Sequence, residues 1–132
     1  MTAYSLDFDP PAPFLLVAIS PRAASPTAQS VGALLDTGAE ISVIPQHIVD
    51  ALGLVPYAEM LIESFDSRRQ RVDMYAVSLG FAGYHLSPVR VVAFRADYAI
   101  LGRDVLNRFL TTLDGPNQAF TMEISQEGKE EE

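Results

Sequence analysis

The chain has 132 residues, of which 48% are hydrophobic, and it contains no cysteine. A single domain with its own core is expected at this length, and disulfides, thiolate metal sites and cysteine nucleophiles are excluded. The formal net charge is −8. This charge argues against nucleic acid and anionic membranes as partners, because both attract clustered lysine and arginine.

The beginning of the sequence predicts an irregular arm followed by a strand. Residues 1–13 contain three prolines, so we expect an N-terminal arm with at most a short edge strand. Residues 14–19 form a short apolar run, which favours a buried strand. This run is too short to cross a bilayer and no Lys or Arg precedes it. We therefore expect neither a membrane span nor a signal peptide. The protein is expected to be cytoplasmic.

A second apolar strand is predicted at residues 31–35, after a loop at 20–30 that is rich in small residues and proline. It leads directly into Asp36. Residues 46–52 place apolar side chains at helical spacing, and Gly53 is a suitable end for that helix.

The middle of the chain predicts a long hairpin. Residues 60–79 have a strand-like composition interrupted by the polar segment 66–70, which we expect to form an exposed tip. A turn is predicted at 80–83, and two further strands follow at 84–86 and 88–94.

The C-terminal part predicts one more strand at 98–102 and a helix at 103–109, where the apolar residues again have helical spacing. A strong turn signal at 114–117 precedes a closing strand at 119–124. Residues 125–132 include four glutamates and one lysine, and they predict an acidic disordered tail. The sum is a mainly β domain with one or two short helices.

The residues with the clearest chemical potential stand where the second strand ends, in the run Asp36-Thr37-Gly38-Ala39. A rigid strand fixes the Asp36 carboxylate, the glycine permits a tight turn, and apolar neighbours such as Leu35 keep the place partly dry. Carboxylate-driven hydrolysis needs a pair, because one carboxylate takes a proton from water while the other, protonated, polarises the substrate carbonyl.

A second Asp-Thr-Gly or Asp-Ser-Gly does not occur in the sequence, and Asp114-Gly115 lacks the middle residue. A paired site must therefore take its second carboxylate from another copy of the chain, across a two-fold axis. Other chemistries have less support. His47 and His85 show no metal-ligand spacing, and no GxSxG-type motif accompanies them.

As a bare tripeptide Asp-Thr-Gly is a weak signal, but its context strengthens it. Ser42 and the apolar residues 43–45 follow it, and Ile-Leu-Gly-Arg-Asp-Val-Leu stands further on at 100–106. With these two motifs in this order, the sequence resembles the retropepsin-like aspartic proteases. The resemblance covers roughly residues 14–124, which we take as the domain.

The resemblance implies a closed β-barrel-like, mainly antiparallel domain that forms a symmetric homodimer with the active site at the interface. It implies that Asp36 is catalytic, that Thr37, Gly38 and Ala39 support the catalytic loop, and that Gly38 and Glu40 line the substrate. It further implies structural support from Ser42, Arg103 and Asp104. We expect Arg103 to form a bidentate, partly buried ion pair with Glu40.

A β-hairpin flap over the cleft is also implied, here at residues 61–75, with Ser64, Phe65 and Asp66 in contact with substrate. Family flaps from retroviruses are rich in glycine at the tip, and this segment has none. Its basic residues Arg68 and Arg69 suit acidic substrates, but charged hairpin tips are more often simply solvated.

The function expected from the resemblance is an aspartic endopeptidase that acts on a peptide or protein substrate, with no metal, no cofactor and no covalent intermediate. Two alternatives stay open at this point. One is a weak or inactive module that keeps the fold for dimerisation or peptide binding. The other is an unrelated β-domain with a chance Asp-Thr-Gly.

Overall fold

The computed structural model describes residues 1–63 and 66–124, which form ten strands and two short helices. In chain order the elements are β1 (Thr2–Ala3), β2 (Phe14–Ser20), β3 (Gln29–Leu35), β4 (Ser42–Pro45), α1 (Gln46–Leu52), β5 (Ala58–Glu63), β6 (Arg69–Phe81), β7 (Tyr84–Phe94), β8 (Ala99–Leu101), α2 (Arg103–Leu106), β9 (Leu110–Asp114) and β10 (Ala119–Glu123).

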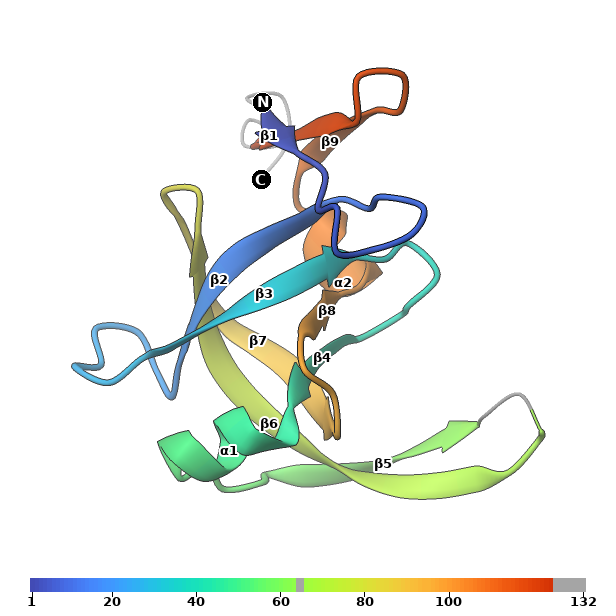
Figure 1. The fold of residues 1–132 in the computed structure, drawn as a ribbon. Coiled ribbons are helices and arrows are strands. Elements are labelled where there is room, and N and C mark those ends of the chain that lie inside the picture. The colour runs from blue at the N-terminus through green and yellow to red at the C-terminus, as the bar shows by residue number, and fades with distance from the viewer. Residues whose placement is uncertain (64–65, 125–132) are drawn as a thin grey trace.

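Six strands close into a barrel. Their order is β2-β3-β8-β4-β7-β6, and the pairing of β6 with β2 completes the ring. Strand β5 pairs only with β6, so the β5–β6 hairpin extends beyond the barrel at one end (Figure 1). Two pairs, β3–β8 and β4–β7, are parallel, and the other barrel pairs are antiparallel. The expected mainly antiparallel barrel is confirmed.

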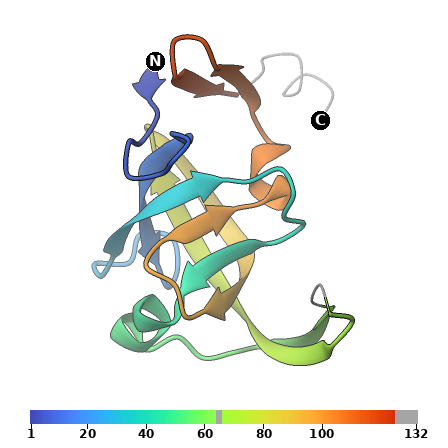
Figure 2. The same cartoon turned by 45° about the vertical axis from the view of Figure 1, so that its right-hand side comes forward.

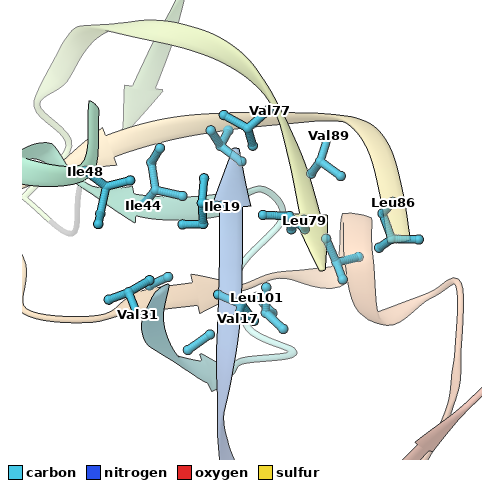
Figure 3. Close-up of a cluster of buried hydrophobic side chains, with 14 of the residues drawn as sticks. Val17, Ile19, Val31, Ile44, Ile48, Val77, Leu79, Leu86, Val89 and Leu101 are labelled. Atoms are coloured by element: carbon cyan, nitrogen blue, oxygen red, sulfur yellow. The ribbon is translucent and has the colours of Figure 1, made fainter. Parts of the chain in front are cut away.

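The barrel is filled by aliphatic side chains that alternate along the strands (Figure 3). In β2, Val17 and Ile19 point inward and are fully buried, Ala18 between them is only half-buried, and Leu16 on the other side of Val17 is 68% exposed. This period of two is what a strand with one face on a core requires. Each buried aliphatic side chain stabilises the fold by about 1.5–3 kcal/mol.

The N-terminal arm packs on the outside of the barrel. The ring of Phe8 lies 5.2 Å from that of Phe14 and 5.4 Å from that of Tyr98, so an aromatic cluster holds the arm to β2. A side chain at Gly32 would collide with the Phe14 ring, and this glycine lets the ring lie flat over β3.

A second, three-stranded sheet has the order β1-β10-β9 and lies at the end of the barrel opposite α1 and the β5–β6 hairpin (Figures 1 and 2). The arm is tied to this sheet by β1 and by the Tyr4 amide, which donates to the Gln118 carbonyl at 2.8 Å. Both chain ends of the described fold therefore meet in one small sheet.

Most expected elements are confirmed, and three differ. The strands predicted at 84–86 and 88–94 form one strand, β7. Pro88 does not interrupt it, because this residue lies opposite a bulge between Val77 and Leu79, where a missing N–H removes no hydrogen bond between the strands. The helix predicted at 103–109 is α2, which ends at Leu106 and continues only as tight turns to Phe109. Strands β4 and β9 were not expected. The predicted tail 125–132 lies outside the described residues.

Candidate active site

Asp36 stands directly after β3, in a tight loop held by main-chain hydrogen bonds. Its amide donates to the Leu101 carbonyl at 3.0 Å, and its own carbonyl accepts from the Ala39 amide at 3.2 Å. The Gly38 amide donates to Asp36 Oδ1 at 2.8 Å, which fixes the orientation of the carboxylate. Among the described residues, Oδ2 accepts no hydrogen bond, so this oxygen is left to other partners.

The second motif supports this loop from behind. A Cβ at Gly102 would lie only 2.8 Å from the Ala39 carbonyl oxygen and 3.0 Å from the main chain of Ile41. Glycine is therefore required for the close approach of the two segments. The Arg103 amide uses that approach and donates to the Ala39 carbonyl at 2.8 Å.

A half-buried carboxylate network joins the two motifs. Asp104 accepts from the Ser42 amide at 3.0 Å, from the Ser42 hydroxyl at 2.7 Å and from the Val105 amide at 2.9 Å. The Ser42 hydroxyl in turn accepts from the Gly102 amide at 3.0 Å. Ser42 is only 1% exposed. Hydrogen bonds to a charged acceptor in such a place are strong, so this network locks the exit of the loop.

The Arg103 side chain supports the loop in a different way from the one expected. Its Nη1 donates to the Thr37 carbonyl at 2.7 Å, whereas its Nη2 lies 4.0 Å from Glu40 Oε1. The Glu40 side chain is 88% exposed. The predicted contact between Arg103 and Glu40 is therefore present as a single long ion pair, but its predicted bidentate, partly buried geometry is wrong, because the guanidinium donates to a main-chain carbonyl and the carboxylate stays in solvent.

A cavity of about 370 Å³ opens between this loop and the β5–β6 hairpin. Its floor and wall come from the loop, β4 and β7, its cover comes from β5, and it is mainly apolar with two carboxylates. It is lined by Gly38, Ala39, Glu40, Ile41, Val43, Met60, Leu61, Ile62, Glu63, Val92 and Phe94. Gly38 and Glu40, which the resemblance assigns to substrate binding, both line this cavity. The apolar residues of β5 and β7 were not singled out from the sequence, although strand alternation alone could have found them.

Of the three hairpin residues expected to contact substrate, one lies within the described residues. Ser64 and Phe65 lie outside the described residues. Asp66 does not line the cavity, and its carboxylate lies 3.2 Å from Arg68 Nε in an exposed ion pair. This arrangement favours the solvated interpretation of the charged tip.

No cluster suited to a metal ion occurs among residues 1–63 and 66–124. His47 and His85 are both exposed and lie on different elements, α1 and β7. No helix in the described part of the chain is long and apolar enough to span a membrane.

Within the described part of the chain, two groups away from the loop have a shifted pKa. Burial, together with the charges of Asp73 and Asp50, raises the pKa of the Tyr75 hydroxyl. The side chain and main chain of Asn117 donate hydrogen bonds to Asp114 and lower the pKa of that carboxyl.

Comparison with known proteins agrees with this geometry. The family model of the gag-polyprotein putative aspartyl protease matches residues 27–108, which include both motifs, so the chain belongs to that family. The sequence has no significant match among curated proteins.

Several solved structures have the same fold. The EIAV protease in complex with the inhibitor HBY-793 is 24% identical, with a TM-score of 0.60 over 80% of this chain and 92% of that one. A retropepsin-like aspartic protease from Rickettsia conorii is 13% identical, with a TM-score of 0.62 over 94% and 90%. The Simian Foamy Virus (mac) protease is 21% identical, with a TM-score of 0.55 over 71% and 91%. The predicted retropepsin-like fold is confirmed.

Proposed function

We propose that the chain is an aspartic endopeptidase that works as a homodimer, with one Asp36 from each protomer at the active site. The observation that carries the proposal is the single Asp-Thr-Gly loop, pinned by the second motif and open to the cavity under the β5–β6 hairpin. The family and the fold support a protease. Because each chain has a single Asp-Thr-Gly motif, the second catalytic carboxylate requires a second protomer.

In the proposed reaction a water molecule lies between the two Asp36 carboxylates, which share one proton. The ionised carboxylate takes a proton from the water while the water oxygen attacks the peptide carbonyl carbon. The protonated carboxylate gives its proton to the carbonyl oxygen, and a neutral tetrahedral diol forms. The diol then collapses: the ionised carboxylate removes a hydroxyl proton, the C–N bond breaks, and the carboxyl group that took the proton from water gives it to the leaving nitrogen.

The Gly38 amide serves this reaction by holding Asp36 Oδ1, so that Oδ2 is presented to the water. Such preorganisation has value because the group does not have to reorient during the reaction. The loop's support by Arg103 and by the Ser42–Asp104 network acts through Asp36, and neither group is proposed to touch the reacting atoms.

The substrate is proposed to bind as an extended strand between the loop and the β5–β6 hairpin, which acts as a flap. Apolar residues dominate the cavity, with Glu40 and Glu63 as its only ionisable lining residues in the described part of the chain. A substrate with an apolar side chain at this subsite, and no acidic residue beside it, fits this lining.

The decisive experiment for activity is Asp36→Asn, which removes the charge but keeps the shape of the side chain. Peptide hydrolysis should fall below about one per cent of wild type, as is usual when an essential acid or base is deleted. Circular dichroism should show an unchanged fold. Residual activity above that level would reject the assignment of Asp36.

The alternative function is a weak or inactive module that uses the same fold for dimerisation or peptide binding. The flap segment without glycine favours it, because the hairpin lacks the residues that most easily allow a tip to bend. A wild-type chain that forms dimers and binds peptides but cleaves none of a denatured proteome would establish this alternative.

A further inference from the structure

One face of the β5–β6 hairpin carries mostly charged side chains. Strand pairing places three pairs on this face, namely Glu59 with Asp73, Leu61 with Arg71 and Glu63 with Arg69, because side chains directly opposite each other share a face. Along β6 it is the face of Tyr75, which belongs to the barrel core. The hairpin therefore directs this face toward the cavity beside the catalytic loop, and Leu61 and Glu63 line that cavity.

The catalytic loop presents a second carboxylate to the same cavity. Glu40 Oε1 lies 4.0 Å from Arg103 Nη2, and the Glu40 side chain is mostly exposed. The other terminal nitrogen of this guanidinium, Nη1, donates to the Thr37 carbonyl at 2.7 Å. Glu40 is thus held only weakly by its own chain, and its carboxylate is accessible to a ligand.

The Glu63 carboxylate is accessible as well. Glu63 is exposed at the end of β5. Arg69 lies opposite it in the hairpin, but these two described residues do not form an ion pair. Both ionisable residues that line the cavity in the described part of the chain are therefore acidic, and they stand on opposite sides of it, one on the loop and one on the hairpin.

Apolar walls with carboxylates at the exposed rim suit a particular kind of side chain. Lysine and arginine bury their methylene stems against apolar surface and keep their charged heads near water. Here the stem would contact residues such as Val92 and Phe94, and the head would reach a glutamate. An acidic side chain would instead meet two like charges.

We propose that Glu40 and Glu63 are specificity-determining residues that select substrates with a lysine or arginine in or next to this cavity. The inference rests on the proposed function and deepens it by naming the substrate class, a basic segment that also contains apolar residues. The formal charge of −8 acts in the same direction, because it attracts basic segments and repels acidic ones at long range.

The test uses peptide mixtures that carry Lys, Gln or Glu at one position and random uncharged residues elsewhere, with that position moved along the peptide. For the wild-type chain, at one position the Lys mixture should be cleaved at least about 5 times faster than the Gln mixture, and the Glu mixture at least about 5 times slower. Equal rates for the three mixtures at every position would overturn the inference.

Matched variants assign the preference to these two residues. Glu40→Gln combined with Glu63→Gln should bring the ratio of the Lys to the Gln rate to within about 2-fold of one. Glu59→Gln is the control, since Glu59 is exposed on the same strand but does not line the cavity, and it should keep the wild-type ratio. A double variant that keeps this ratio would overturn the inference.

Charge reversal separates recognition from a merely structural role. Glu63→Lys should change the ratio of the Glu to the Lys rate at least about 10-fold in favour of the Glu mixture. A structural defect would lower both rates equally, and an unchanged ratio would reject the role of Glu63. In about 1 M NaCl, where the screening length is about 3 Å, the wild-type preference should weaken.

Binding of the same mixtures to the wild-type chain, measured by fluorescence anisotropy, separates the two proposals. Cleavage of all mixtures at equal rates would reject the selectivity and leave the proposed function standing. Tighter binding of the Lys mixture, lost in the double glutamine variant and accompanied by no cleavage, would reject the proposed function and leave the basic-residue site standing.

Discussion

The Ser42 hydroxyl is predicted to be the most sensitive single group that holds the candidate catalytic loop to the second motif. It donates to Asp104 Oδ1 at 2.7 Å and accepts from the Gly102 amide at 3.0 Å, and Ser42 is 1% exposed. Ser42→Ala leaves a buried amide without an acceptor and removes one donor from the carboxylate. Each loss is about 1–3 kcal/mol, so about 3 kcal/mol of stability should disappear.

That loss corresponds to a fall in Tm of about 10 °C for a domain of this size. The matched control is Ser78→Ala, since Ser78 is also buried but makes one bond of 2.6 Å to the neutral Ser87 hydroxyl. This control should lose about 1 kcal/mol. Both variants should be melted at equal chain concentration, because dimerisation couples to stability. Equal losses in the two variants would refute the argument that the Ser42–Asp104 network pins the loop.

Three further predictions concern charge and pH. Arg103→Lys should lower peptidase activity about 10-fold in kinetic assays, because it loses the planar donor on the Thr37 carbonyl. Glu40→Gln should change the free energy of unfolding, measured by thermal melts, by less than about 1 kcal/mol. The hydrolysis rate should form a bell on the acid to neutral side, and a rate that still rises above about pH 9 would contradict a shared proton. Since burial raises the pKa of Tyr75, the fold favours its neutral form, and stability should fall as pH rises above about 10 in urea unfolding, less so in Tyr75→Phe.

The fold was largely predictable because most strands have a clear apolar pattern. Residues 14–19 and 31–35 lie between proline-rich or polar segments, and the alternation within them survives in the burial of β2 and β3. Gly53 ends α1 in the left-handed conformation that its position after the helix predicted.

The missed elements have a common cause, which is that their pairing partners are distant in sequence. Strand β4 pairs with β7 and β8, and β9 pairs with β10, so neither is identified by its own four or five residues. The Leu-Thr-Thr-Leu run of β9 also comes directly after the helical pattern at 103–109, and no glycine or proline separates the two segments. Only the tertiary fold shows that this segment is an edge strand.

The candidate site was predictable as a set of residues but not as a set of contacts. The two motifs meet as expected: Ser42, Asp104 and Gly102 form one hydrogen-bonded unit, and the Asp36 amide donates separately to the Leu101 carbonyl of the second motif. The Arg103 contact with Glu40 was wrong in its geometry, because sequence shows which charges can pair but not which main-chain carbonyl lies closer.

The central claim is that two copies of Asp36 share one active site, and mixed dimers test it most directly. Wild-type chain at fixed concentration is equilibrated with an equal amount of Asp36→Asn chain, and peptide hydrolysis is measured. If each site needs Asp36 from both protomers, random pairing should reduce the activity to about half, and further excess of the variant should reduce it towards zero. Activity that stays constant as the variant is added would contradict the shared site.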